Sequence, residues 1–266
     1  MRASLLQIDV NSQESVAARR ERVAALVREQ TDSDLVVLPE LWNVGAFAYE
    51  SFDSGAEAAA DGPTAGAMAA AAADAGVWLH AGSIVERAPD GTLYNTSLVF
   101  GPDGALHGTY RKIHRFGFDE GEAVMMGGGQ ELVTVELPDA VAGLATCYDL
   151  RFPEMFRRLT DAGATLFVLP AGWPARRRGH WTLLGRARAV ENQAYVLACC
   201  SAGTNGGVQG AGHSQVVDPW GEVLAEAGEE EQVLTVELDP GKVATTREQF
   251  PVLRDRVLGL DLPKGA

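Results

Sequence analysis

Residues 141–169, VAGLATCYDLRFPEMFRRLTDAGATLFVL, hold the pattern on which the fold depends. Two short apolar runs in it, Ala142–Thr146 and Leu166–Leu169, have the length and composition of buried strands. Between them, Pro153–Ala162 is predicted to form a helix. A strand–helix–strand unit of this kind is typical of a sheet covered by helices. Cys147 falls at the point where the first strand gives way to the helix.

The same alternation continues on both sides of this unit. We predict further helices at Val16–Arg28, Ala65–Ala75 and Trp181–Gln193. We predict further strands at Leu5–Val10, Leu35–Leu38, Val77–Val85, Thr96–Phe100, Leu132–Glu136, Tyr195–Cys200, His213–Val217, Glu222–Leu224 and Val233–Leu238. No stretch has the composition of a linker between domains, and no repeat is present. The pattern predicts one α/β domain over residues 1–266, built as a layered sandwich.

Composition narrows the classes of partner. A formal net charge of −14 argues against nucleic acid, because proteins bind phosphate through Lys and Arg. The first residues lack the apolar length and cleavage site of a signal peptide, and no apolar run reaches the ~20 residues of a membrane span. Three cysteines, two of them adjacent, do not form a disulfide framework. We therefore expect a cytoplasmic protein that binds neither nucleic acid nor membrane.

Three reactive side chains follow apolar strands. Glu40 ends the segment DLVVLPE, Lys112 lies within GTYRKIHRF, and Cys147 follows VAGLAT. In open α/β sheets, ligand sites gather beyond the carboxyl ends of strands. These three residues are therefore candidates for a common site.

Each candidate also has an ordinary structural interpretation. A buried cysteine usually packs as a small hydrophobe, although the polar residues after Cys147 favour a nucleophile. Glu40 could form a salt bridge at the end of its strand. Lys112 is one of only three lysines in a chain rich in arginine, which hints at a compact point charge. The adjacent Cys199 and Cys200 end an apolar strand and are predicted to be packing residues with the wrong spacing for zinc.

Two other kinds of site are less well supported. A Cys–His pair could draw on five histidines, but none of them lies in a recognisable protease signature. The run Gly127–Gly129 does not follow a strand with the spacing of a dinucleotide-binding loop, so no nucleotide site is predicted.

Together these segments resemble the nitrilase, or carbon–nitrogen hydrolase, superfamily. Five motifs carry the resemblance in order along the chain: LPEL with Glu40, YRKIH with Lys112, CYDLRFPE with Cys147, RARAVENQAYV (Arg186–Val196) and GHSQVVDPWGEVL (Gly212–Leu224). The resemblance implies a four-layer α-β-β-α sandwich. It also implies a homodimer or a higher homo-oligomer that pairs through the helices after the nucleophile.

The resemblance also assigns roles to residues. It implies that Cys147 is the nucleophile, Glu40 the base and Lys112 the partner of the oxyanion, with the backbone N–H of Tyr148 as a second donor. A further glutamate follows the lysine motif in many members, and Glu122 stands there, with Glu120 as an alternative. Such chemistry requires no metal and no organic cofactor.

Two segments narrow the substrate. AGWPARRRGHW and GHSQVVDPWGEVLAEAG resemble the omega-amidase and deaminated-glutathione amidase branch, whose substrates are small amides that carry a carboxylate. We predict that Arg176 binds that carboxylate, because guanidinium meets carboxylate with two hydrogen bonds. Trp173 and Phe116 are predicted to wall the pocket. Arg176–Arg178 could instead be a solvated loop, and a nitrile or an N-carbamoyl compound remains an alternative substrate.

Overall fold

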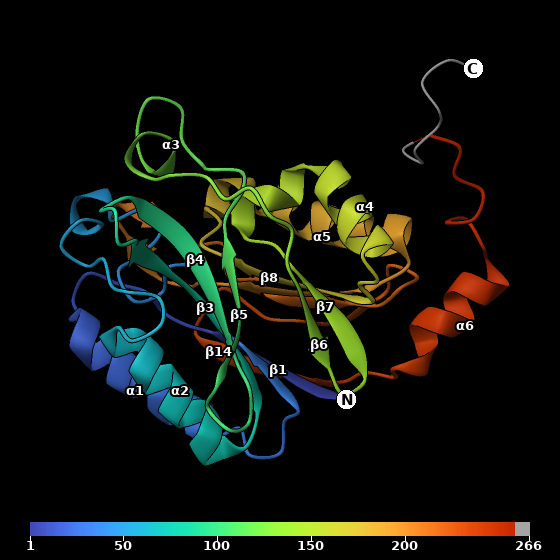
Figure 1. Cartoon of the computed structure of the whole chain (residues 1–266), viewed down its shortest axis with the longest axis horizontal. Coiled ribbons are helices and arrows are strands. Elements are labelled where there is room, and N and C mark those ends of the chain that lie inside the picture. The colour runs from blue at the N-terminus through green and yellow to red at the C-terminus, as the bar shows by residue number, and fades with distance from the viewer. Residues whose placement is uncertain (259–266) are drawn as a thin grey trace.

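The computed structural model describes residues 1–258, and residues 259–266 of the predicted domain lie outside the described part. Two six-stranded sheets lie face to face, with helices on their outer sides (Figure 1). The four-layer α-β-β-α sandwich predicted from the resemblance is confirmed.

The first sheet has the strand order β14-β1-β2-β3-β4-β5. Its strands are β1 (Arg2–Gln7), β2 (Leu35–Val37), β3 (Trp78–Arg87), β4 (Leu93–Phe100), β5 (Leu106–Arg111) and β14 (Gln232–Glu237). The central strands β1, β2 and β3 are parallel, and the outer pairings are antiparallel. The carboxyl ends of β1, β2 and β3 therefore meet at one edge.

The second sheet repeats this plan, with the order β13-β12-β9-β8-β7-β6. Its strands are β6 (Thr134–Leu137), β7 (Ala140–Leu144), β8 (Leu166–Ala171), β9 (Tyr195–Cys200), β12 (Gln215–Val217) and β13 (Val223–Glu226). Here β7, β8 and β9 are the parallel strands. A separate hairpin joins β10 (Thr204–Asn205) and β11 (Val208–Gln209).

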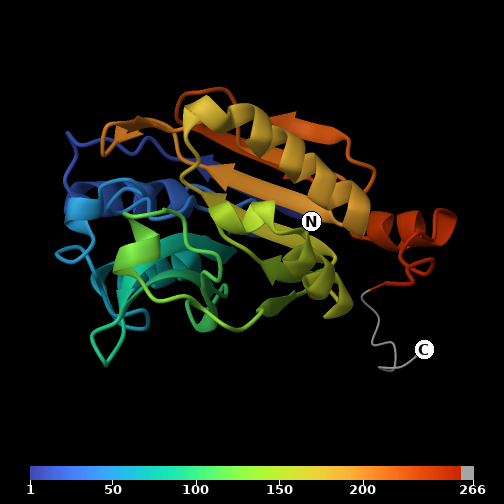
Figure 2. The ribbon, with the colours of Figure 1, turned by 90° about the horizontal axis from the view of Figure 1, so that it is seen from above.

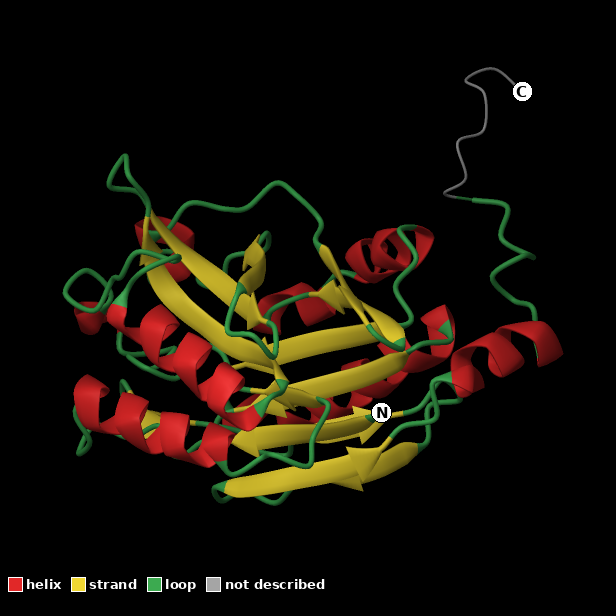
Figure 3. Cartoon of the chain, turned by 60° about the horizontal axis from the view of Figure 1, so that its bottom comes forward, coloured by secondary structure: helices red, strands yellow, loops and turns green. Residues whose placement is uncertain are grey.

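Helices cover the outer face of each sheet. On the first sheet they are α1 (Val16–Arg28) and α2 (Pro63–Ala75), and on the second α4 (Pro153–Asp161) and α5 (Arg178–Asn192). The short α3 (Glu122–Met125) lies in the loop between β5 and β6, and α6 (Gly241–Gln249) follows β14 and projects beyond the sandwich (Figure 1). Figure 3 shows α1 and α2 side by side on the first sheet, and Figure 2 shows α5 over the strands of the second. No helix among residues 1–258 is long and apolar enough to cross a membrane.

Alternate residues of the central strands enter different cores. Leu5 and Val37 belong to the core between the sheets, whereas Leu6 and Val36 pack with the helices α1 and α2. Strands that are covered on both faces need apolar side chains at every position. This requirement explains the continuous apolar runs from which these strands were predicted.

Most predicted elements are present, with some shifted bounds. The helix at Val16–Arg28 and the strand at Tyr195–Cys200 have the predicted bounds. The strand predicted at Leu5–Val10 instead spans Arg2–Gln7. The short elements α3, β10 and β11 were not predicted. Nor were two longer ones: β5 is an edge strand in which one residue is fully buried, and α6 buries only two of its residues. Neither has enough apolar residues to produce a periodic pattern.

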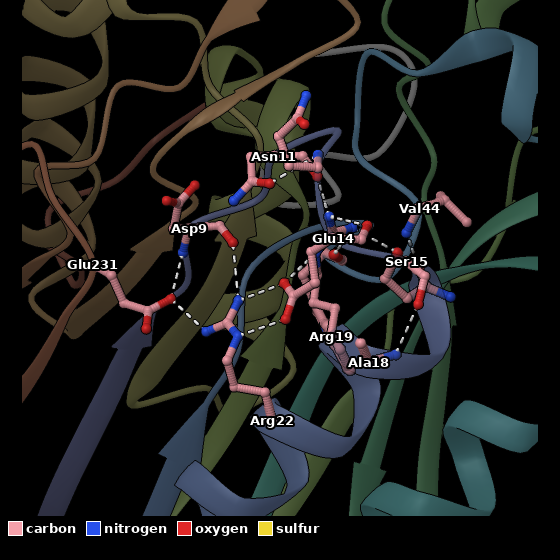
Figure 4. Close-up of polar contacts among 12 residues, drawn as sticks. Asp9, Asn11, Glu14, Ser15, Ala18, Arg19, Arg22, Val44 and Glu231 are labelled. Atoms are coloured by element: carbon pink, nitrogen blue, oxygen red, sulfur yellow. Dashed lines mark hydrogen bonds and ion pairs between the residues drawn. The ribbon is translucent and has the colours of Figure 1, made fainter.

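A polar network fastens α1 to the loops at the carboxyl edge of the first sheet (Figure 4). The buried guanidinium of Arg19 donates to the carbonyl oxygen of Asn43 at 2.9 Å, and also to that of Asn11. Arg22 forms ion pairs with Glu14 and Glu231 at 2.9 and 2.7 Å. Because Asn43 lies three residues after Glu40, this network fixes the loop that leaves β2.

Candidate active site

Four ionisable side chains from separate elements line one cavity. Glu40 follows β2, Lys112 follows β5, Glu122 begins α3, and Cys147 begins a 3₁₀ helix after β7. All four are buried, and the cavity has a volume of about 370 Å³ including its open mouth. The structure therefore brings together all four residues that the resemblance implies for the site, Glu122 included. Glu120, the alternative to Glu122, is exposed.

Two glycines let the backbone approach Glu40 closely. Gly82 has φ +66°, and a Cβ on it would lie 1.9 Å from the carbonyl oxygen of Pro39. A Cβ on Gly172 would lie 2.3 Å from the Cβ of Ala46. Because Gly172 has no side chain, its N–H can approach Glu40 and donates to Oε2 at 2.8 Å. The carboxylate is thus held from the second sheet as well as from the first.

The ammonium of Lys112 lies between two carboxylates. Its Nζ donates to Oε1 of Glu40 at 2.7 Å and to Oε2 of Glu122 at 2.6 Å. The side-chain amide of Asn95 donates to the same two glutamates, at 2.8 Å to Oε1 of Glu40. A buried charge is stable only where it is paired and hydrogen-bonded, and each charge in this cluster meets that condition.

Burial and charge set the protonation of the cluster. Burial alone would lower the pKa of Lys112, but its attraction to Glu122 and Glu40 outweighs burial and raises that pKa well above its usual value. Burial, reinforced by the negative charge of Glu40, raises the pKa of the Cys147 thiol well above its usual value. The resting site therefore holds an ammonium and a neutral thiol.

Cys147 has a backbone conformation that side chains seldom adopt. Its φ is +47°, in the left-handed region, which costs a residue other than glycine about 1–2 kcal/mol. The flanking Thr146 and Asp149 hold this turn, because the N–H of Thr146 donates to Oδ2 of Asp149 at 2.8 Å. Asp149 also accepts hydrogen bonds from Tyr110 at 2.7 Å and from the backbone of His114 at 3.0 Å. The turn that presents the sulfur is therefore tied to the lysine segment.

The N–H of Tyr148 is available for a ligand. Within residues 1–258 it donates to no backbone or side-chain acceptor, and Tyr148 lines the cavity. It lies beside the sulfur of Cys147 in sequence and is predicted to face the same space as Lys112. A backbone donor and an ammonium on one side of a nucleophile can together stabilise an oxyanion.

Of the three residues predicted to contact the substrate, two line the cavity and one does not. Phe116 and Trp173 line it. Arg176 is exposed and is not among the lining residues, whereas its neighbour Arg177 is half-buried and lines the cavity with Arg151. Within the short 3₁₀ helix Ala175–Arg177, a step of one residue turns the side chain to another side.

Arg151 and Arg177 were missed at the sequence level. The guanidinium of Arg151 lies 4.7 Å from the ring centre of Trp173, and that of Arg177 lies 5.3 Å from the ring centre of Phe116. Burial, followed by repulsion from Arg176 and Arg151, lowers the pKa of Arg177. An anion bound between Arg151 and Arg177 would relieve the repulsion between these two side chains.

The other cysteines are packing residues, as predicted. Cys199 and Cys200 are fully buried, and burial raises the pKa of both thiols, that of Cys200 to about 12. In the described part of the chain, no group of three or more His, Cys, Asp or Glu side chains is arranged to hold a metal ion.

Glu40, Lys112 and Cys147 thus meet at one cavity, and comparison with known proteins shows the family to which the chain belongs. The chain belongs to the carbon–nitrogen hydrolase family, whose model matches residues 2–248. It is therefore an enzyme of the class that hydrolyses carbon–nitrogen bonds.

Individual relatives cover nearly the whole chain. The 2-oxoglutaramate amidase of Paenarthrobacter nicotinovorans is 42% identical over 98% of this chain and 90% of its own length. The omega-amidase NIT2 of Mus musculus is 37% identical over 96% of this chain and 94% of its own length. A solved carbon–nitrogen hydrolase superfamily protein of Xanthomonas campestris is 34% identical, with a TM-score of 0.89 and 97% of each chain covered.

Replacement of Lys112 by methionine should make stability strongly dependent on pH. The variant leaves two buried carboxylates without their cation, a change that typically costs about 3–5 kcal/mol. Their pKa values in the folded state would rise above those in the unfolded state, so stability is retained at about pH 5 and falls as the pH rises toward 8. Thermal unfolding across this range measures the effect.

Arg28→Met is the matched control, because it breaks an exposed ion pair with Asp74. Exposed pairs contribute at most about 1 kcal/mol, so this variant should follow the wild-type profile. A Lys112→Met variant with the same pH dependence as the wild type would contradict the expected role of the ammonium.

Proposed function

We propose that this protein is an omega-amidase-like amidase. It would hydrolyse a small amide of the 2-oxoglutaramate type, which carries a carboxylate, to a dicarboxylate and ammonia through a thioester on Cys147. The observation that carries this proposal is the buried cluster of Glu40, Lys112 and Cys147 at a cavity that Arg151 and Arg177 also line. Two relatives are named as amidases of such compounds, which supports the same substrate class.

In the proposed first half-reaction, the thiol proton passes from Cys147 to Glu40 while the sulfur attacks the amide carbon. Charge then develops on the amide oxygen. Two N–H bonds of Lys112 are directed to glutamates, which leaves its third for this oxygen, together with the N–H of Tyr148. One such preorganised donor is typically worth about 2.7–4 kcal/mol of barrier.

Collapse of the tetrahedral adduct breaks the carbon–nitrogen bond. Glu40 returns its proton to the leaving nitrogen, ammonia departs, and the acyl group remains on Cys147 as a thioester. A water molecule then attacks the thioester while Glu40 accepts its proton, and the thiol is regenerated as the acid leaves. Glu122 remains ionised beside Lys112 and holds the ammonium in place.

The two arginines at the cavity are proposed to bind the distant carboxylate of the substrate. Arg177 and Arg151 take the role predicted for Arg176, because they line the cavity and Arg176 does not. Guanidinium binds carboxylate with two parallel hydrogen bonds. The aromatic faces of Phe116 and Trp173 hold the two guanidinium groups from the side.

The cellular setting is also a proposal. Three cysteines without a disulfide among the described residues support a reducing compartment such as the cytoplasm. A homodimer that pairs through α5 is supported by Leu183 and Val190, which lie seven residues apart on one face of that helix and are exposed. Trp220, also exposed, lines a groove with Val190.

The proposed activity is tested by ammonia release from a panel of amides. 2-Oxoglutaramate should be hydrolysed faster than deaminated glutathione, simple nitriles or N-carbamoyl amino acids. Cys147→Ala should be inactive yet folded, with a loss of at least about 10⁴-fold, because no thioester can form. Cys200→Ala serves as a control for a cysteine that packs in the core. No turnover of any amide would refute the proposal.

Arg177→Ala should weaken binding of amides that carry a carboxylate. Loss of a charge-assisted hydrogen bond typically costs about 1.5–3 kcal/mol, so the KM for 2-oxoglutaramate should rise about 10- to 150-fold. The KM for a neutral amide such as butyramide should change little. Arg176→Ala is the matched control and should resemble the wild type. Equal effects of Arg177→Ala on both substrates would exclude the carboxylate role.

Charge on the exposed face of α5 should disrupt the proposed dimer. Leu183→Glu with Val190→Glu places two carboxylates where an apolar contact is expected, and the protein should then elute as a monomer with the mass measured by light scattering. Val124→Glu, at an exposed position on α3, is a control that should leave the mass unchanged. A wild-type protein that is already a monomer would contradict the proposal.

A further inference from the structure

Asn95 is the one uncharged side chain that contacts both glutamates of the cluster in the described chain. It lies on β4 and is buried, with 3% of its surface exposed. Its Nδ2 donates to Oε1 of Glu40 at 2.8 Å and to Oε1 of Glu122. Its backbone carbonyl also accepts from the N–H of Lys112 at 2.8 Å, so one residue contacts all three charged partners.

The contacts fix the orientation of the amide. Both neighbours are acceptors in their ionised form, so the NH₂ end of Asn95 must face them. Its Oδ1 is buried and has no hydrogen-bond partner among the described residues. The structure thus leaves a polar oxygen unsatisfied in order to direct both N–H groups at carboxylates, which is an arrangement with a free-energy cost.

Each glutamate accepts hydrogen bonds from three donors: an ammonium, a side-chain amide and a backbone N–H. Lys112 and Asn95 donate to both carboxylates. The third donor is a backbone N–H, from Gly172 to Glu40 and from Phe116 to Glu122, each at 2.8 Å. Asn95 is the member of this set that lies between the two carboxylates and brings no charge.

We propose that Asn95 is a positioning residue that keeps Glu40 and Glu122 as two separate carboxylates, so that the proton of Cys147 can pass only to Glu40. This inference rests on the proposed amidase chemistry.

The physical reason is the behaviour of paired carboxyl groups. Two carboxylates in one buried site tend to share a proton, because like charges at short range cannot both remain ionised without donors. A Glu40 that already carried a shared proton could not accept another from the thiol. The donors of Asn95 favour the ionised form of both groups and so leave Glu40 free to act as base.

A neutral donor suits this position better than a second cation. With one ammonium, two carboxylates and a neutral thiol, the cluster carries a net charge of −1, and proton transfer from Cys147 to Glu40 leaves that total unchanged. A second cation would stabilise the carboxylate of Glu40 further and weaken it as a base. The titratable groups that interact with Glu122 are Glu40, Lys112, Cys147 and, more distantly, Tyr49 and Tyr110.

The balance at Glu122 supports this view. Burial raises the pKa of Glu122, the charge and hydrogen bond of Lys112 and the hydrogen bond of Asn95 lower it, and the charge of Glu40 raises it, with a net upward shift. Removal of the amide would raise this pKa further. The pair would then take up a proton at a higher pH.

Two substitutions of Asn95 separate an electrostatic role from a purely structural one. Asn95→Ala removes both donors, and Asn95→Asp keeps the shape but adds a third carboxyl group. Protonation of the pair abolishes the base, so the acidic limb of kcat/KM against pH should move upward by about one unit in the alanine variant. It should move further in the aspartate variant, because that variant adds negative charge. The value of kcat should fall about tenfold or more, with a smaller change in KM.

A structural role predicts the opposite order. The isosteric Asn95→Asp would then be the milder variant, and neither variant would move the acidic limb. Asn192→Ala, which removes a fully buried asparagine of α5 remote from the cavity, is the matched control and should leave the pH profile unchanged. If the alanine variant does not fold, the aspartate variant decides the result by itself.

Alkylation of Cys147 by iodoacetamide gives a second readout that needs no amide substrate. Its rate against pH, followed by mass spectrometry, reports transfer of the thiol proton, and Cys199 and Cys200 are fully buried. If the wild type hydrolyses no amide but the Asn95 variants shift the alkylation profile upward, the proposed function fails and the inference stands. Alkylation profiles of folded Asn95 variants that match the wild type would overturn the inference.

Discussion

The structure depends on one buried ammonium held between two buried carboxylates. Lys112 forms hydrogen bonds of 2.7 and 2.6 Å with Glu40 and Glu122, and each of the three residues comes from a different element. Removal of Lys112 would leave two carboxylates without their cation in a medium of low dielectric constant, which is among the most destabilising changes in a protein. The ends of β2, β5 and the start of α3 are therefore fixed relative to one another by electrostatics, while apolar packing fixes the sheets.

This cluster also governs the thiol. Burial and the charge of Glu40 keep Cys147 protonated in the resting enzyme, and Lys112 opposes that effect. In the proposed reaction the thiolate therefore forms only as the proton moves to Glu40, beside the ammonium that stabilises the developing negative charges. The left-handed turn at Cys147, held by Thr146 and Asp149, directs the sulfur into the cavity lined by these groups.

The sequence predicted those parts of the site that follow from local pattern. Glu40 and Cys147 could be found because each follows a continuous apolar run, and such runs arise where a strand is covered on both faces. Asn95 could not, because a single asparagine inside the strand Leu93–Phe100 resembles any polar residue of a half-exposed strand, and its partners lie on other elements. Arg176 was predicted instead of Arg177 because composition shows a basic run but not which side chain a 3₁₀ turn directs inward.

Charge also gives a reason for arginines in the cavity of the proposed enzyme. A cluster with a net charge of −1 repels a substrate that carries a carboxylate, and burial strengthens that repulsion. Arg151 and Arg177 also line the cavity, so in the proposed complex their positive charges would attract the carboxylate of the amide and keep it away from Glu40. In the proposed complex the amide carbon must then reach Cys147 from that fixed end. The distance between the arginines and the sulfur would thus select substrates by the number of carbons between carboxylate and amide, a selection that a neutral pocket of the same shape could not make.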